Sequence, residues 1–215
     1  MRSENLTSGP GNSGSPRDRT FIETARRAQI IAAAVDTIAD LGYGQASLAR
    51  IAERAGTSKG VICYHFAGKD ELVRDLVADV VTKAEAYLRP LVSAETTGAG
   101  MLRTSIEANV AYMREHRNEM IAVAEIARNA RDADGNRPFD SSFVQAGVTA
   151  LSRVLAHFQE TGEFRAGFDP AVMAAAIRAA IDAIPARLAR DPGLDLDHYG
   201  RELANLFDVA TRGGP

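Results

Sequence analysis

Polar side chains of the types that bind nucleic acid gather in one short stretch of the sequence, residues 47–69. Lys59 carries an ammonium group that can reach a guanine edge or a phosphate, and Ser58 and Tyr64 carry hydroxyl groups that can donate to either. Gly60 lies between them without a side chain, so a helix that contains it can approach a duplex closely. These residue types at this spacing indicate contact with DNA rather than catalysis.

Patterns typical of catalysis are missing from the sequence. We find no Ser/His/Asp order, no spacing of metal ligands and no glycine-rich phosphate loop. His116 and His157 are isolated in the sequence and lack the pairing that a metal site needs. We therefore predict that the protein is not an enzyme, that it has no metal site and that it needs no cofactor.

The small and apolar residues of the same stretch follow the spacing of a helix-turn-helix. Ala52 is the small residue at which two steeply crossing helices touch, Gly56 allows the sharp turn, and Ile62 faces back from the second helix. Ser47 and Ser58 stand at the two helix starts, where each is expected to accept a backbone N–H. In such a motif the second helix enters the major groove with its N-terminal end toward the bases.

The string Thr-Ser-Lys-Gly-Val-Ile-Cys-Tyr-His-Phe from Thr57 to Phe66, followed by Lys-Asp-Glu-Leu from Lys69, resembles the recognition helix and the next helix start of the TetR family. The resemblance covers about residues 21–75. It implies an N-terminal three-helix DNA-binding unit. It also implies a fourth helix leading to a C-terminal domain that dimerises and usually binds a small-molecule inducer.

Nine residues are expected to contact DNA: Ser47, Thr57, Ser58, Lys59, Gly60, Cys63, Tyr64, His65 and Lys69. Ser47 is expected on the DNA backbone, and Lys69 begins a helix whose dipole and free N–H groups favour a phosphate. His65 can donate, and a proton there would strengthen a phosphate contact as pH falls. A structural hydrogen bond is the alternative for His65, and packing with an exposed hydroxyl is the alternative for Tyr64.

Two further features concern the same domain. Cys63 departs from the family pattern, because family members often carry a second aromatic residue there; both a groove contact and a redox role of the thiol remain open. Arg26 and Arg27 lie early in the first helix and are expected to touch the DNA backbone.

The composition indicates a helical protein. Alanine is abundant and Trp is absent, which favours helices over sheets. The single cysteine rules out an intrachain disulfide, and no apolar run approaches the roughly 20 residues of a membrane span, so we expect a cytoplasmic protein. Residues 1–69 hold nine Lys/Arg against six Asp/Glu, whereas residues 70–215 hold sixteen against twenty-two, which suits a small DNA-binding module on an acidic body.

Breaks rich in Gly, Pro, Ser and Asp divide the chain. We expect a disordered tail over residues 1–18, a helix-turn-helix domain over 19–67, and an effector-binding and dimerisation domain over 68–215. The predicted fold class is all-α, with a three-helix unit joined to a helical bundle and about nine helices in total. The helices are expected near 21–41, 48–55, 58–66, 69–89, 99–116, 118–130, 140–160, 170–189 and 196–211, with Pro90 ending the fourth.

The C-terminal domain is predicted to hold a ligand among polar residues on apolar helix faces and adaptable methionines. The residues are Asn109, Met113, Met120, Glu125, Phe143 and Met173. The alternative is that the methionines belong to the core and that Glu125 pairs with Arg128.

The last two helices are predicted to dimerise through alanine-rich apolar faces, as a four-helix interface about a two-fold axis. The faces comprise Met173, Ala176, Ile177, Ala180, Ile184, Leu203, Leu206 and Phe207. The alternative is that these faces form the core of a single chain. Pro185 is expected to kink or shift its helix.

The sequence thus predicts a ligand-responsive repressor that acts as a homodimer on a near-palindromic DNA operator, with the helix near 69–89 coupling the two domains. The expected partners are operator DNA, a second copy of the chain and a small-molecule effector, with no membrane. The alternative is a DNA-binding regulator whose C-terminal domain binds a protein partner or no ligand.

Overall fold

The structure is a computed structural model that describes residues 16–132, 134–139 and 142–212. These residues form ten helices and no strands, which confirms the predicted all-α class. The helices are α1 Pro16–Leu41, α2 Leu48–Arg54, α3 Lys59–His65, α4 Lys69–Ser93, α5 Gly98–Glu115, α6 Arg117–Asn129, α7 Ser142–Glu160, α8 Pro170–Asp182, α9 Ile184–Arg190 and α10 Leu196–Thr211.

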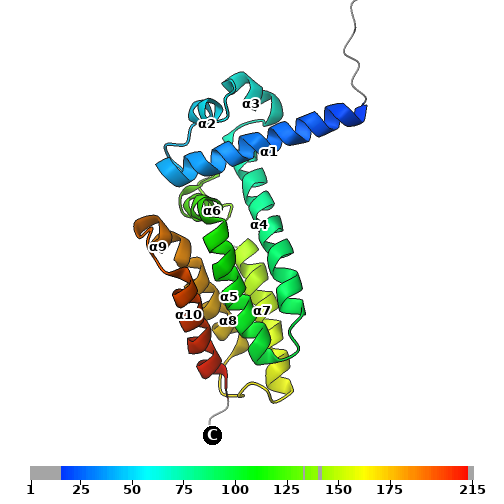
Figure 1. Cartoon of the computed structure of the whole chain (residues 1–215), viewed down its shortest axis with the longest axis vertical. Helices are drawn as coiled ribbons and strands as arrows, with labels where there is room; N and C mark the ends of the chain where they lie inside the picture. Colours follow the sequence, from blue (N-terminus) through cyan, green and yellow to red (C-terminus); the bar gives the residue numbers. More distant parts are fainter. Residues whose placement is uncertain (1–15, 133, 140–141, 213–215) are drawn as a thin grey trace, which may run out of the picture.

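The ten helices lie in two groups along the long axis of the molecule (Figure 1). Helices α1, α2 and α3 form the upper group, and α5, α7, α8 and α10 run alongside one another below. Helix α4 descends from the first group along the second, and α6 lies between the two groups. No helix in the described parts of the chain is long and apolar enough to cross a membrane.

Local sequence signals explain where the N-terminal helices begin and end. The Ser47 and Ser58 side chains each accept a backbone N–H, from Arg50 and Val61 respectively, at 3.3 Å, as predicted for helix caps. Gly42 and Gly56 follow α1 and α2 with φ of 77° and 62°, a left-handed conformation that glycine adopts without strain.

Three helix boundaries differ from the sequence predictions, and prolines mark all three. Helix α1 begins at Pro16, inside the predicted tail, because proline suits the first turn of a helix; residues 1–15 lie outside the described residues. Helix α4 continues past Pro90 to Ser93, since a proline so close to the helix end removes only one internal hydrogen bond. The predicted helix 170–189 divides at Ala183 into α8 and α9, as Pro185 led us to expect, so there are ten described helices rather than nine.

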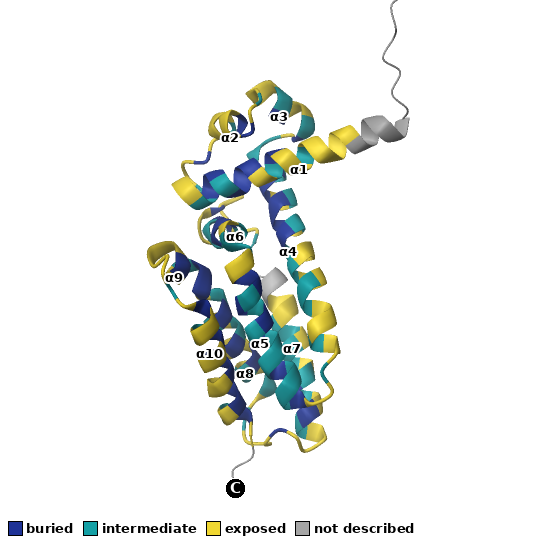
Figure 2. Ribbon diagram, in the orientation of Figure 1, coloured by how far each residue is buried: buried dark blue, intermediate teal, exposed yellow. Residues whose placement is uncertain are grey.

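Two hydrophobic cores fill the molecule, and Figure 2 shows buried residues in both groups of helices. The first core holds Ile30, Ala34, Ile38, Ile51, Ala52, Ile62, Phe66, Leu72, Leu76, Ala122 and Ile126 among others. The second core holds Leu102, Ile106, Met113, Ile121, Leu155, Ile177, Ile184, Leu203 and Phe207 among others.

Helix α6 contributes to both cores. Ala122 and Ile126 are buried in the first core, Ile121 is buried in the second, and Met120 packs against both. Because these residues lie within two turns of one helix, any movement of α6 changes the packing of both groups. From the sequence we predicted that α4 couples the two domains, and the shared packing of α6 was not predicted.

Candidate DNA-binding site and its junction with the helical bundle

Helix α3 has one face in the first core and one face in solvent. Ile62 and the following Phe66 are buried, whereas Lys59, Gly60 and Cys63 are exposed and Tyr64 is 80% exposed. The inner face packs against α2 through its buried residues Ile51 and Ala52, as the helix-turn-helix spacing predicted. The outer face therefore presents an ammonium group, a bare stretch of backbone, a thiol and a phenol along two turns of helix.

The start of α3 is also open to a ligand. Ser58 is exposed and Thr57 is half-buried. Ser58 Oγ accepts the Val61 N–H, and its own hydroxyl hydrogen can still donate to a phosphate or a base. A Cβ at Gly60 would meet only the Ser58 Oγ at 3.6 Å, an ordinary contact. Packing within the chain thus gives no reason for glycine at position 60.

His65 occupies a different environment from its neighbour Tyr64. The two rings make an edge contact with centroids 5.0 Å apart. His65 is half-buried, and its Nδ1 has no hydrogen-bond partner among the described residues. The structural hydrogen bond considered as an alternative is therefore not made through this nitrogen.

Lys69 is engaged within the chain. Its Nζ donates to the Tyr43 carbonyl oxygen at 2.6 Å and lies 4.0 Å from the centroid of the Tyr43 ring. Burial lowers the pKa of Lys69, and the nearby Asp70 carboxylate opposes this effect. A phosphate contact by this ammonium would have to share or replace the bond to Tyr43. The first N–H groups of α4 remain available there, since Gly68 supplies no side-chain cap.

Arg27, which was predicted to touch the DNA backbone, makes several contacts within the chain. Its Nη1 donates to the His65 carbonyl, and its Nη2 pairs with Asp75 and with Glu71 of α4. Its guanidinium also lies over the Phe66 ring, 4.2 Å from the centroid. No spacing pattern in the sequence signals these contacts, because Arg27 is 38 to 48 residues away from its hydrogen-bond partners.

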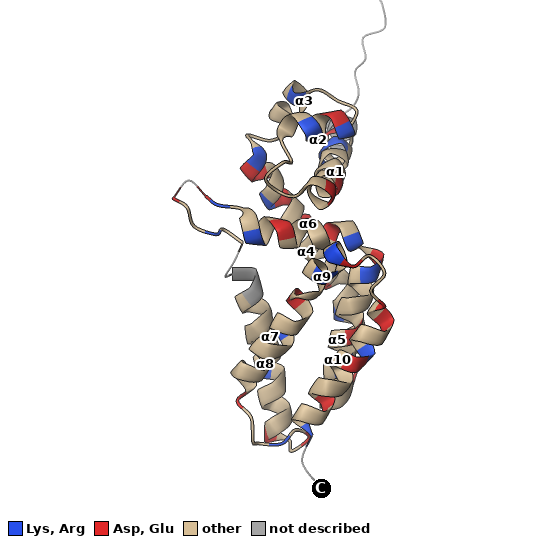
Figure 3. Cartoon of the chain, turned by 90° about the vertical axis from the view of Figure 1, so that its left-hand side faces the viewer, with Lys and Arg blue, Asp and Glu red and all other residues tan. Residues whose placement is uncertain are grey.

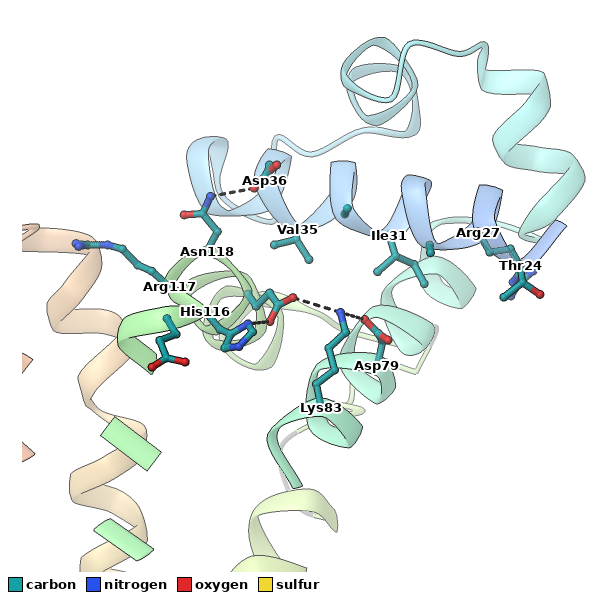
Figure 4. Close-up of a pocket in the computed structure, with 14 residues that line it drawn as sticks. Thr24, Arg27, Ile31, Val35, Asp36, Asp79, Lys83, His116, Arg117 and Asn118 are labelled. Carbon is teal, nitrogen blue, oxygen red and sulfur yellow. Dashed lines mark hydrogen bonds and ion pairs between the residues drawn. The ribbon is translucent and has the colours of Figure 1, made fainter. Parts of the chain in front are cut away.

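A cavity of about 780 Å³ lies under α1, where the two groups of helices meet (Figure 4). We call it the junction cavity. Its lining is Thr24, Arg27, Ala28, Ile31, Ala32, Val35, Asp36, Asp79, Lys83, Glu115, His116, Arg117, Asn118 and Glu119. Apolar side chains of α1 form one wall, and charged side chains of α4 and of the α5–α6 turn form the others.

Polar contacts around the junction cavity fix the start of α6. Glu119 pairs with Lys83 of α4 at 3.4 Å and with His116 Nδ1 at 2.9 Å. It also accepts a hydrogen bond from the Tyr112 hydroxyl at 3.5 Å, and burial together with the Glu119 charge raises the pKa of Tyr112 to about 12. Asn118 donates to Asp36 of α1 at 2.9 Å. These contacts join α6 to α1, α4 and α5.

The predicted ligand residues do not gather around one cavity. Asn109 donates to the Ser105 carbonyl at 2.7 Å, and Glu125 accepts hydrogen bonds from Arg128 and Asn129, as the alternative interpretation of Glu125 expected. Met113 is buried in the second core and lines a smaller cavity of about 240 Å³. Met120 and Met173 are partly buried, and the side chain of Phe143 lies outside the described residues.

The predicted dimer residues divide between core and surface. Ile177, Ile184, Leu203 and Phe207 are buried within their own chain, as the alternative of a single-chain core expected. The reason is that α8 packs on α7 and α10 packs on α5, which uses one apolar face of each helix. Leu206 is 62% exposed, Ala176 is exposed, and Met173 and Ala180 are half-buried. Val172 and Val209, which the prediction did not include, are also exposed.

The fold and the exposed face of α3 define a helix-turn-helix protein with a C-terminal helical bundle. Among the described residues, no three His, Cys, Asp or Glu side chains are grouped so as to hold a metal ion.

Known proteins agree with this class. Residues 30–76 match the sequence profile of bacterial regulatory proteins of the tetR family. The HTH-type transcriptional regulator BetI 1 of Chromohalobacter salexigens is 42% identical over 60 residues, which are 28% of this chain and 30% of that protein. The HTH-type transcriptional activator FasR of Mycolicibacterium smegmatis is 33% identical over 95 residues, 44% of this chain and 43% of that protein. The chain thus spans less than half the length of either curated relative.

The likeness in fold extends over most of the chain. The transcriptional regulator FadR from Bacillus subtilis, solved in complex with stearoyl-CoA, superposes with a TM-score of 0.73 at 21% sequence identity. This superposition covers 86% of this chain and 99% of FadR. The tetR-family match thus covers residues 30–76, and the superposition on FadR shows the same fold over most of the chain.

Proposed function

We propose that the protein is a DNA-binding transcriptional regulator that acts as a dimer and whose hold on its operator responds to a small molecule, in the simplest case as a repressor. The observation that carries this proposal is the solvent face of α3. Lys59, Gly60 and Tyr64 are exposed together there, while Ile62 and Phe66 anchor the opposite face. Such a helix presents hydrogen-bonding groups to the base edges of a major groove.

The DNA contacts would divide into two kinds. Lys59, Gly60, Cys63 and Tyr64 would meet the groove, with Thr57 and Ser58 at the N-terminal end of the helix. Ser47, at the start of α2, would meet the DNA backbone together with His65 and the start of α4 at Lys69. In a dimer, two such helices would lie in successive major grooves about 34 Å apart.

The exposed apolar residues of α8 and α10 support dimerisation through these helices. Val172 is 67% exposed, Leu206 is 62% exposed and Val209 is 73% exposed. Helices α7 and α8 show few charged residues in Figure 3, and within α8 the charges are limited to Arg178 and Asp182. A surface with large apolar side chains and few charges is typical of a subunit interface.

A small-molecule effector would bind in the bundle below α6. The support is the shared packing of α6, since Ile121 and Met120 contact the second core while Ala122 and Ile126 contact the first. A ligand that favours one arrangement of the bundle would therefore shift the equilibrium between two placements of α1, α2 and α3. FadR, with the same fold, was solved in complex with stearoyl-CoA.

The test of DNA binding begins with selection of duplexes from a random-sequence library by the wild-type protein. The affinity of the selected duplex is then measured for Lys59→Ala and Tyr64→Ala, with Arg190→Ala on the remote helix α9 as the control. Each contact of this kind contributes about 1–3 kcal/mol, so each variant should bind roughly 10- to 100-fold more weakly. The proposal fails if no sequence is enriched, or if both α3 variants bind as tightly as the control.

A further inference from the structure

One guanidinium group joins three separate elements at the end of the helix that would read DNA. Arg27 of α1 donates to the carbonyl of His65, the last residue of α3, and pairs with Glu71 and Asp75 of α4. The same group covers the Phe66 ring at 4.2 Å. We call these residues the Arg27 cluster.

The Arg27 cluster also holds the connection between α3 and α4. Glu71 Oε1 lies 3.5 Å from the Arg27 Nη2, and Glu71 Oε2 accepts the backbone N–H of Ala67 at 2.7 Å. The Ala67 N–H, together with Arg27, lowers the pKa of Glu71. The short connection from Phe66 to Gly68 is thus tied to the first turn of α4.

The end of α3 needs such a partner. The last carbonyl groups of any helix accept no hydrogen bond from within that helix. Helix α3 is also only seven residues long, so its own length does little to fix its direction. A cation beside the final carbonyl satisfies that oxygen and complements the negative end of the helix. The planar guanidinium has five N–H donors in a fixed fork, so Nη1 can hold His65 while Nη2 holds Asp75 and Glu71, whereas an ammonium group would have to reach all three from one nitrogen.

The same contacts argue against a phosphate contact by Arg27. Its donors are directed inward to His65, Glu71 and Asp75, and the side chain is about one-third exposed. Figure 4 shows it on the α1 wall at one end of the junction cavity. Its neighbour Arg26, by contrast, is exposed and donates to Gln29 of its own helix at 2.8 Å.

We infer that Arg27 is a positioning residue for DNA recognition. It fixes the end of α3 against α1 and α4, and thereby sets the angle at which Lys59 and Tyr64 meet the groove. The inference rests on the proposed DNA-binding function and adds a residue that does not itself touch DNA. A change in this angle would weaken contacts with base edges more than contacts with phosphates, because hydrogen bonds to base edges require a more exact alignment of donor and acceptor.

The experiment uses the full-length protein, the duplex that the wild type selects from a random library, and a scrambled duplex of equal length. Two quantities are measured: the ratio of the two affinities, and the slope of log affinity against log salt concentration. Arg27→Gln should lower the ratio about tenfold or more and leave the slope unchanged. Arg27→Lys keeps the charge without the fork and should not restore the ratio, and Arg190→Gln on the remote helix α9 is the control that should behave as wild type.

Any of the following results would overturn the inference. Equal ratios for Arg27→Gln and wild type, with or without a lower melting temperature, would mean a merely structural role. Weaker binding to both duplexes with a slope smaller by about one would mean a direct phosphate contact. If Arg27→Gln does not fold, Asp75→Asn keeps the guanidinium and removes one partner; an unchanged ratio there would equally refute the inference. A wild-type protein that selects no sequence would refute the proposed function itself.

Discussion

The group of helices α1, α2 and α3 and the helical bundle differ in how closely their candidate functional residues lie in the sequence. In the first group, the residues with suitable chemistry are consecutive in sequence and exposed together on α3. In the bundle, the residues singled out for a ligand or a dimer scatter between the second core, the surface and local hydrogen bonds. The residues by which one short helix makes contacts can be predicted from their spacing in the sequence. The residues of a pocket or an interface depend instead on which helices pack together.

The sharpest test of this division lies in two neighbouring aromatic residues of the first group. Phe66 is buried to 1% exposure and Tyr64 is 80% exposed. Phe66→Ala leaves a cavity and should lower the free energy of unfolding by roughly 3–5 kcal/mol, whereas Tyr64→Ala should change it by less than about 0.5 kcal/mol. Urea unfolding followed by circular dichroism measures both. Similar losses for the two variants would show that α3 is not divided into a packing face and a DNA-facing face.

The next test concerns the proposed dimer face of the bundle. Leu206→Glu places a charge on an exposed apolar patch, so it should weaken dimerisation about tenfold or more and leave the folded monomer intact. Analytical ultracentrifugation measures the dissociation constant, with Leu91→Glu on the exposed part of α4 as the control. Equal dimerisation of both variants and wild type would place the interface elsewhere.

Two helical glycines sharpen the comparison further. A Cβ at Gly200 of α10 would lie 3.2 Å from the Cβ of Val110 on α5, whereas a Cβ at Gly60 of α3 meets only the Ser58 Oγ at 3.6 Å. Gly200→Ala should therefore destabilise the protein by about 1–3 kcal/mol, and Gly60→Ala should stabilise it by up to about 1 kcal/mol. Gly60→Ala should nevertheless weaken binding to the selected duplex. Thermal unfolding and fluorescence anisotropy check the two effects, and tighter DNA binding by Gly60→Ala would contradict a close approach of this backbone.

The smallest expected effect is a loss of stability at acidic pH. It would come from Glu71, which holds the connection between α3 and α4. Because the pKa of Glu71 is below its ordinary value of 4.5 in the fold, its contribution to stability is present above that pH. The contribution is lost as pH falls through the lowered pKa. Wild type should thus be more stable than Glu71→Gln at neutral pH, with the difference vanishing in acid, while Glu85→Gln on the exposed side of α4 should change the stability little at neutral pH. Urea midpoints measured between pH 3 and 7 test this, and a constant difference would contradict it.

The sequence predicted the helix ends around α2 and α3 closely because their signals are local. Ser47, Ser58, Gly42 and Gly56 each determine a helix end through their own backbone or a neighbour three residues away. It could not predict the Arg27 cluster, because contacts across 38 or more residues leave no spacing pattern. Nor could it separate the buried and exposed apolar faces of α8 and α10, since periodicity shows that a face is apolar without showing what covers it.

The most direct test of the account uses the single cysteine of the chain. Cys63 is exposed on α3, one residue before Tyr64 and four after Lys59, so a duplex bound to this face must cover it. The rate at which N-ethylmaleimide modifies Cys63 is measured by mass spectrometry, with the selected duplex at saturation, with a scrambled duplex, and without DNA. We predict that the selected duplex slows the modification at least tenfold and that the scrambled duplex has little effect. An unchanged rate in a sample whose anisotropy shows saturated binding would mean that α3 is not the helix that meets DNA.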